Sequence, residues 1–360
     1  MMDGLEILPV RGIGDVTAGD DLAETILHAA PWLRDGDVLV VTSKIVSKAE
    51  GRLVEVPADG PEREVAREQI LADETARVVA RRGPTAIVQT HHGFVMASAG
   101  IDASNVDKTH LVLLPRDPDA SAQALRDGFL ARGLHVGVIV SDTTGRAWRN
   151  GLTDVALGSA GIEPVRDHRG EIDPYGNELQ LTQMAVVDEL AGAGELVKGK
   201  RDRVPVAVVR GYPGAGLADT PGARLLLRDA ASDMFSLGTA EARAAGLREA
   251  ATLPEAAPVP AASGPGASPP AATDPARIER ALATVADHLA SDTTPTTAAP
   301  ADPAAGTGPV VIRLTTSGTG PAAWVRLGAD AHRLRAALAA EGTAARVTVD
   351  DEGVLIVPVP

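Results

Sequence analysis

One segment near the middle of the chain gathers side chains that bind metal ions, phosphates and carboxylates. The sequence SDTTGRAWRNG, residues 141–151, follows an apolar run rich in valine that predicts a buried strand. Ligands of α/β proteins commonly bind beyond strand ends, so Asp142 and Thr143 are expected at such a site. A carboxylate beside a hydroxyl suits Mg²⁺. Arg146 and Arg149 can hold carboxylate or phosphate oxygens.

A second polar segment, TSKIVSKAEG at residues 42–51, follows the apolar strand pattern DVLVV. If a helix begins there, Lys44 and Lys48 share one face and Ser43 lies in its first turn. Hydroxyls and ammonium groups at a helix start suit a polyphosphate, although the glycine pattern of a Walker A loop is absent. A solvated helix start capped by serine explains the same residues, and the sequence leaves that alternative open.

Lysine is rare in this chain, which makes its placement informative. Of the 34 basic residues only five are lysine, and four of these form two close pairs, Lys44 with Lys48 and Lys198 with Lys200. Because lysine offers a compact point charge and arginine a planar fork, paired lysines indicate a need for a compact charge. Chance clustering is the alternative.

Residues 98–105, SAGIDASN, form a loop of small residues that allows a ligand to approach closely. Asp102 can bind a hard cation, and Asn105 can contact a phosphate or a base edge. Asx turns explain the same residues without any ligand. Asp102 and Asp142 both follow strand-like segments, and two carboxylates that converge on a cation from different strands form a common kind of Mg²⁺ site.

Composition excludes several other classes of protein. The chain has no cysteine, so disulfides, iron–sulfur clusters and cysteine nucleophiles are ruled out. A net charge of −14 and an aromatic content of 2% argue against nucleic-acid binding. His91, His92 and His168 lack the spacing of a zinc site. No long apolar run predicts a membrane span and no signal-type N-terminus is present, so a cytoplasmic protein is expected.

The residue pattern predicts a mixed α/β (α+β) fold rather than a regular alternation of strands and helices. Helices are expected at 20–30, with Asp20 as N-cap, at 61–82, 119–132 and 182–196, and through most of 224–249. Strands are expected at 5–10, 37–41, 86–89, 93–97, 109–114, 135–140 and 204–209.

The composition changes at Pro254, where Pro, Ala, Ser, Thr and Gly begin to dominate. We therefore predict a large domain at 1–248, a linker at 249–309 with one helix at 274–290, and a small module at 310–360. The last region follows the order strand, helix, strand, strand (βαββ) and carries no obvious catalytic residues. An interaction or capping role is expected for it.

Seven segments in this order resemble the coenzyme F420-0:γ-glutamyl ligase family: LPVRGIGDVTAGDDL, DGDVLVVTSKIVSKAEGR, AGIDASNV, SDTTGRAWRNG, DPYGNEL, VKGK and VAVVRG. The resemblance covers about residues 5–248 and is closest to the N-terminal ligase half of the actinobacterial bifunctional ligase/reductase. It implies that family's α/β fold and a homodimer with the site near the subunit boundary. It also implies coenzyme F420 biosynthesis, by ligation of L-glutamate to the carboxylate of coenzyme F420-0 and of further glutamates through γ-carboxylates.

The same resemblance implies a nucleotide site and a cation site. GTP is the expected co-substrate, with Mg²⁺ or Mn²⁺ at two sites, K⁺ as a further ion, and an acyl phosphate intermediate. The implied nucleotide-binding residues are Ile13, Gly14, Asp15, Val16, Ser43, Lys48 and Asn105. The implied cation ligands are Asp102, Asp142 and Thr143. Three further candidates for catalysis rest on their chemistry alone: Lys44, Arg146 and Arg149.

Two other classes of function stay open at this point. The chain could be a metal–nucleotide-binding regulator whose tail binds a partner, or a phosphohydrolase that uses Asp102 and Asp142. The region after residue 248 is too short for the flavin-binding reductase domain of the bifunctional relatives, so no flavin is expected. Physical reasoning from the sequence does not distinguish GTP from ATP, or Mg²⁺ from Mn²⁺.

Overall fold

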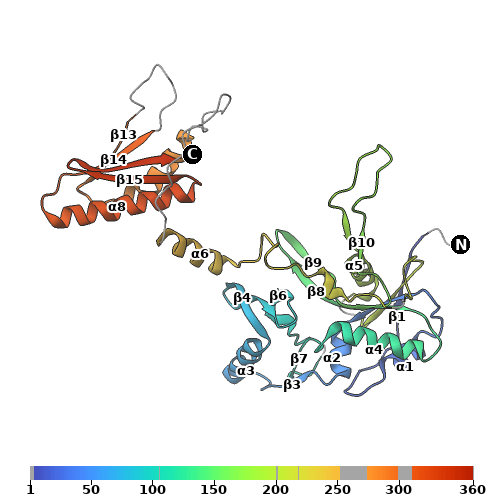
Figure 1. The fold of residues 1–360 in the computed structure, drawn as a ribbon. Coiled ribbons are helices and arrows are strands. Elements are labelled where there is room, and N and C mark those ends of the chain that lie inside the picture. The colour runs from blue at the N-terminus through green and yellow to red at the C-terminus, as the bar shows by residue number, and fades with distance from the viewer. Residues whose placement is uncertain are drawn as a thin grey trace. The chain divides into compact units, whose positions relative to one another are not determined.

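The computed structural model describes residues 4–104, 106–199, 202–217, 219–251, 274–298 and 310–359. The chain divides into two compact units, Met1–Glu241 and Ala242–Pro360, which are described separately. Figure 1 labels their helices and strands. Among the described residues, no helix is long and apolar enough to cross a membrane.

The N-terminal unit is built around a five-stranded sheet with the order β1-β12-β2-β8-β9. Its strands are β1 (Glu6–Val10), β12 (Val206–Arg210), β2 (Val38–Thr42), β8 (Gly137–Arg146) and β9 (Arg149–Ala160). β2 and β8 run parallel, and the other neighbouring pairs are antiparallel. β2 and β12 are apolar along both faces because helices cover both sides of the sheet. The expected mixed α/β class is confirmed.

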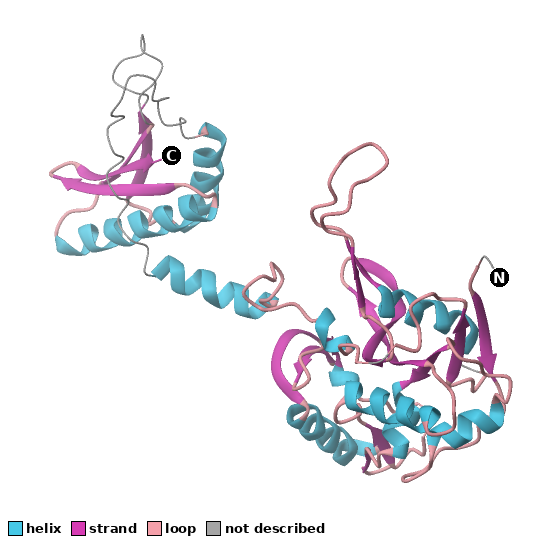
Figure 2. Ribbon diagram, turned by 45° about the vertical axis from the view of Figure 1, so that its right-hand side comes forward, coloured by secondary structure: helices cyan, strands magenta, loops and turns pink. Residues whose placement is uncertain are grey.

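Helices pack on both faces of this sheet (Figure 2). On one face, Phe129 joins Val41 in the core, and on the other face Leu190 packs with Val40. A Cβ atom at Gly194 would lie 2.9 Å from the Cβ of Val40, so glycine allows this close approach of helix and sheet. The first face is covered by α1 (Leu22–Ala29) and α4 (Pro118–Leu130), and the second by α5 (Val186–Lys198).

Shorter elements complete the N-terminal unit. α2 (Ser43–Ala49) follows β2 directly and begins at its carboxyl end. The loop at 168–182 extends away from the sheet in both views (Figures 1 and 2). The other elements are β3 (Leu53–Glu55), α3 (Gly60–Asp73), β4 (Thr75–Arg82), β5 (Thr85–Thr90), β6 (Val95–Ala97), η1 (Ser98–Gly100), β7 (His110–Val112), β10 (Val165–Asp167), β11 (Gln183–Ala185) and η2 (Ala223–Leu226). They form the three small sheets β4-β5-β6, β3-β7 and β10-β11.

β8 is longer than the sequence predicts. The apolar pattern ends at Val140, but the strand continues to Arg146 and turns directly into β9. Antiparallel pairing with β9 holds this polar half in place, with Asp142 opposite Val155 and Thr143 opposite Asp154. The expectation that Asp142 lies at a strand end is therefore wrong. It lies within β8, just beyond the part that β2 covers.

Two helix predictions also need correction. The segment predicted as one helix at 61–82 contains α3 and then β4, because the β-branched stretch TARVVARR pairs with β5. The segment 224–249 is helical at its two ends only, in η2 and α6 (Thr239–Ala251). Between them, the carboxylates of Asp229 and Asp233 accept backbone hydrogen bonds two residues on, which favours turns. The N-cap of α1 is Asp21 rather than Asp20.

The C-terminal unit has its own sheet and its own core. Its four strands have the order β13-β14-β16-β15, and every neighbouring pair is antiparallel. Leu327 and Leu334 of the long helix pack with Ile312, Leu314 and Ile356 of the sheet. The elements are α7 (Pro275–Val285), η3 (Ala286–His288), β13 (Thr293–Ala298), β14 (Val311–Thr316), α8 (Pro321–Ala340), β15 (Ala344–Asp350) and β16 (Gly353–Val359).

This core reaches into the region that the sequence analysis assigned to a linker. Ile278 and Ala281 of α7 are buried in it, and β13 pairs with β14 along its length. Residues 252–273, which connect α6 and α7, lie outside the described part of the chain. Alanine and threonine dominate α7 and β13, and composition alone does not separate such elements from linker sequence.

We expect an isolated fragment of residues 274–360 to unfold cooperatively, because its core is made of side chains from that range. Leu334→Ala should lower the fragment's unfolding free energy by about 2–5 kcal/mol, since Leu334 is fully buried. Val325→Ala on the same helix is the matched control, because Val325 is 73% exposed and its loss should change little. Urea denaturation followed by circular dichroism measures both. A fragment without a cooperative transition would contradict this description of the unit.

Candidate functional site

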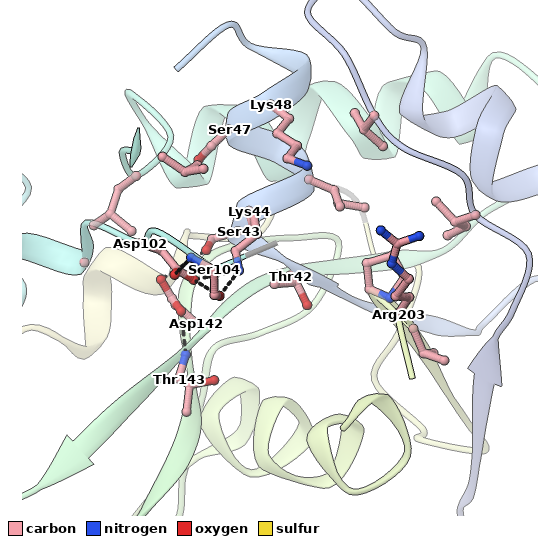
Figure 3. Close-up of a pocket in the computed structure, with 18 of the residues that line it drawn as sticks. Thr42, Ser43, Lys44, Ser47, Lys48, Asp102, Ser104, Asp142, Thr143 and Arg203 are labelled. Carbon is pink, nitrogen blue, oxygen red and sulfur yellow. Dashed lines mark hydrogen bonds and ion pairs between the residues drawn. The ribbon is translucent and has the colours of Figure 1, made fainter. Parts of the chain in front are cut away.

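A cavity of about 430 Å³ opens where β2 ends and α2 begins. Its wall is formed by the loop 13–16, by α2, by the loop 100–104, by the polar half of β8 and, after α5, by residue 199 and residues 203–205. Figure 3 shows Ser43, Lys44, Asp102, Ser104 and Asp142 gathered at one end of this cavity. Segments that are far apart in the sequence thus supply one site.

Most of the residues proposed from the sequence line this cavity. They are Ile13, Gly14, Asp15, Val16, Ser43, Lys44, Lys48, Asp102, Asp142 and Thr143. Arg146 and Arg149 do not line it, because both lie at the far end of the β8–β9 hairpin, where Arg146 donates to the carbonyl of Asn150. Asn105 lies outside the described residues.

The turn from β2 into α2 directs two serines into the site. Thr42 is the N-cap, with extended backbone angles, and Ser43 is the first residue of the helix. Ser43 and Ser47 lie one turn apart, and both are buried. Among the described residues the hydroxyl of Ser47 has no hydrogen-bond partner. A buried donor without a partner beside a cavity is available to a ligand.

Asp102 is held by a lysine and by its own loop. The ammonium of Lys44 lies 2.6 Å from Asp102 Oδ2 and donates to Ser104 Oγ at 2.7 Å. The backbone N–H and the hydroxyl of Ser104 both donate to the same carboxylate. Burial would raise the pKa of Asp102, but the hydrogen bonds and the charge of Lys44 outweigh it and lower that pKa. Asp102 is therefore ionised and already paired.

The pKa of Asp142 is shifted in the opposite direction from that of Asp102. Its carboxylate accepts hydrogen bonds from the backbone N–H of Thr143 at 2.7 Å and from the hydroxyl of Ser43 at 3.1 Å. Burial raises its pKa to about 6, and the nearby charges of Asp154 and Asp102 add to the rise. Within the described part of the chain no lysine or arginine forms an ion pair with Asp142. A bound cation would supply the missing charge.

A third aspartate lies behind Thr143. Asp154 of β9 accepts a hydrogen bond from the hydroxyl of Thr143 at 2.8 Å and is paired with Lys198 at 2.7 Å. Its side chain is 2% exposed and that of Lys198 is 1% exposed. Burial would raise the pKa of Asp154, but the charge of Lys198 and the hydrogen bonds outweigh it and lower that pKa.

The sequence analysis did not select Asp154 and Lys198 as site residues, although a signal for each was present. Lys198 belongs to the second of the two lysine pairs, and Asp154 lies three residues after the segment 141–151. Glu195 and Arg203 also line the cavity, and the guanidinium of Arg203 lies 3.9 Å from the carboxylate of Asp15. Asp154 and Lys198 are 44 positions apart, so neither segment by itself predicts that they pair.

The arrangement suits an anionic ligand that is bound together with a hard cation. Carboxylate and hydroxyl oxygens are ligands that Mg²⁺ prefers, and the lysines of α2 can bind phosphate. In the described residues no group of three or more acidic or histidine side chains is arranged to hold a metal ion. Mg²⁺ often binds through one or two carboxylates with the rest of its ligands from water and phosphate, so this geometry fits it.

Fold and site together define an α/β protein whose cavity combines carboxylates, hydroxyls and lysines at the end of a parallel strand pair. The sequence model of one family, F420-0:Gamma-glutamyl ligase, matches residues 12–211. The chain belongs to this family.

Individual relatives agree with that assignment. The chain is 40% identical over 249 residues to the coenzyme F420:L-glutamate ligase of Methanothermobacter thermautotrophicus, a match that covers 64% of this chain and 99% of that protein. It is 41% identical over 250 residues to the protein of the same name from Haloarcula marismortui, covering 64% of this chain and 95% of that one.

Asp142→Asn should stabilise the ligand-free protein at neutral pH. A carboxylate whose pKa is raised in the folded state favours folding only while protonated, and that contribution is lost as the pH rises from about 4 through about 6. The amide avoids this loss, so the variant should be more stable by about 2–3 kcal/mol at about pH 7.5 and equally stable at about pH 4.

Urea denaturation of both proteins at the two pH values, with a chelator present, measures this difference. Ser236→Ala is a suitable control because Ser236 is remote in sequence and does not line the cavity. A variant less stable than the wild type at neutral pH would show that the charge of Asp142 is already compensated.

Proposed function

We propose that this chain is a GTP-dependent ligase that joins L-glutamate to the carboxylate of coenzyme F420-0, and further glutamates through γ-carboxylates, in coenzyme F420 biosynthesis. The observation that carries the proposal is the overlap of the family match at 12–211 with the cavity, whose lining residues fall between 13 and 205. The description of the family names F420-0, and the names of the relatives supply L-glutamate.

The proposed chemistry explains why a phosphate donor is needed. A carboxylate is a poor electrophile, so its oxygen first attacks the γ-phosphorus of GTP and displaces GDP. The resulting acyl phosphate is attacked at carbon by the amino group of glutamate, which loses a proton as inorganic phosphate leaves. Phosphoryl transfer depends mainly on positioning and charge neutralisation, and this cavity is rich in the groups that provide them.

Asp102, Asp142 and Thr143 are the proposed ligands of a divalent cation, Mg²⁺ or Mn²⁺, with Thr143 directed to a second ion. The half-buried carboxylate of Asp142, which forms no ion pair among the described residues and has a raised pKa, supports this role. When bound, such a cation neutralises phosphate charge during transfer. Lys44 would then hold Asp102 in place or, once displaced from it, contact the transferred phosphoryl group.

The nucleotide phosphates are proposed to lie along α2. Ser43, Ser47 and Lys48 all line the cavity from this helix, and the backbone of residues 13–16 forms the neighbouring wall. Asn105 keeps the nucleotide contact that the family resemblance implies. Because the hydroxyl of Ser47 lacks a partner in the described structure, it extends the set of nucleotide contacts beyond those chosen from the sequence.

A homodimer forms part of this proposal. The exposed side chains of Trp148 and Phe235, with ring centroids 4.8 Å apart, offer an apolar surface for such a contact. Sedimentation equilibrium of the full chain tests the oligomeric state, and a monomer at micromolar concentration would contradict it.

Lys48→Ala should weaken GTP binding roughly tenfold to a hundredfold, since a charge-assisted contact to phosphate is removed. Binding of coenzyme F420-0 should change much less. Isothermal titration calorimetry measures both affinities, and Lys108→Ala, which removes an exposed lysine outside the cavity, is the matched control. Unchanged GTP affinity in Lys48→Ala would remove this residue from the phosphate site.

The activity itself is tested by incubating the protein with coenzyme F420-0, L-glutamate and either GTP or ATP. Mass spectrometry then measures the masses of the products. We expect a glutamate-dependent product with GTP, its loss in Asp142→Asn, and largely intact ligation by a chain shortened to residues 1–253. Nucleotide hydrolysis that needs neither glutamate nor coenzyme F420-0 would indicate a phosphohydrolase instead. Nucleotide binding without any product would indicate a regulator.

A further inference from the structure

Lys198 is a buried charge that the proposed reaction does not use directly. It is the last residue of α5, where a cation interacts favourably with the helix dipole, and its side chain is 1% exposed. Its ammonium donates to Asp154 Oδ2 at 2.7 Å and to Ser141 Oγ at 2.9 Å. Thr42 Oγ1 at 3.4 Å and Glu195 Oε2 at 3.6 Å lie further away. A lysine this deeply buried is retained only where its charge is paired.

Both oxygens of Asp154 are occupied by this network. Oδ2 accepts from Lys198 and from the hydroxyl of Ser141, while Oδ1 accepts from the hydroxyl of Thr143. The backbone N–H of Thr143 in turn donates to Asp142. A continuous chain of contacts therefore runs from Lys198 through Asp154 and Thr143 to the carboxylate of the proposed cation site.

Asp154 is close enough to matter to that site. It lines the same cavity as Asp102 and Asp142, and its charge contributes to the raised pKa of Asp142. Because Asp154 Oδ1 lies 2.8 Å from the hydroxyl of Thr143, itself a proposed cation ligand, a free Asp154 carboxylate would add an acidic ligand beside it. In the described structure the three do not form a metal-binding group, and Asp154 is paired with Lys198.

We propose that Lys198 is a positioning residue, an internal counter-charge that keeps Asp154 bonded to Thr143 and out of the divalent cation site. This inference rests on the proposed function. With Asp154 bonded to Lys198, the carboxylates proposed as cation ligands are Asp102 and Asp142, and Asp102 is already paired with Lys44. The remaining ligands of the cation then have to come from the nucleotide phosphates and from water. The cation therefore binds tightly only together with its nucleotide.

A purely structural role for Lys198 predicts a different behaviour. If the lysine only filled space beneath β8, its removal would loosen the fold and weaken every ligand. If it is a counter-charge, its removal frees Asp154 and makes cation binding stronger when no nucleotide is present. A gain in affinity is an outcome that loss of packing does not produce.

The test measures Mn²⁺ binding without nucleotide, by electron paramagnetic resonance of the free ion, to the full-length protein. We expect Lys198→Met to bind Mn²⁺ about tenfold more tightly than the wild type does. The double variant Lys198→Met with Asp154→Asn should return to about the wild-type affinity, because it lacks the freed carboxylate. Lys108→Met removes an exposed lysine and controls for the change in net charge.

Lys198→Gln keeps a hydrogen-bond donor for Asp154 and serves if Lys198→Met fails to fold, as judged by circular dichroism. A folded lysine variant with unchanged or weaker Mn²⁺ binding would overturn the inference. Tighter binding that persists in the double variant would also overturn it, since Asp154 would not be the added ligand.

Asp142→Asn separates this inference from the proposed function. If that substitution leaves Mn²⁺ binding unchanged in both the wild-type and the Lys198→Met backgrounds, the cation site itself is misplaced and the proposed function loses its metal assignment. If it abolishes binding in the wild type while Lys198→Met shows no gain, the cation site stands and only the role of Lys198 is wrong.

Discussion

The parallel pairing of β2 with β8 is the constraint on which the site depends. Among the described strands of the central sheet it is the one parallel pair, and its register places Thr42 beside Ser141. Both strands therefore leave the paired region at the same edge of the sheet, and the hydroxyl of Ser43 comes within 3.1 Å of the carboxylate of Asp142. Antiparallel pairing would have placed the end of one strand beside the start of the other and separated these groups.

Three aspartates share this region, and each is compensated in a different way. Asp102 is paired with Lys44 near the surface, and Asp154 is paired with Lys198 in the interior. Asp142 lies between them with hydrogen bonds but no ion pair within the described residues. The site thus concentrates its uncompensated charge on one carboxylate. At neutral pH that carboxylate destabilises the ligand-free protein, because its pKa is raised by burial and by the neighbouring carboxylates.

The sequence predicted the parts of this site that depend on local patterns. Apolar runs located β2 and the first half of β8, and polar residues next to them identified Ser43, Lys44 and Asp142. Interactions between distant segments could not be predicted in the same way. The polar half of β8 is a strand because β9 pairs with it, and β4 is a strand because β5 does. The pairing of Asp154 with Lys198 likewise exists only after α5 packs on the sheet.

The separate core of the C-terminal unit has a consequence for how such a chain can change during evolution. The Methanothermobacter thermautotrophicus relative is covered almost in full by 64% of this chain. The ligase region therefore exists elsewhere without a tail of this length. The hydrophobic side chains of α7, α8 and their sheet pack with one another, so the unit does not need the ligase region to complete its core. A gene can gain or lose it in a single fusion or deletion, and its residues can diverge without compensating substitutions around the cavity.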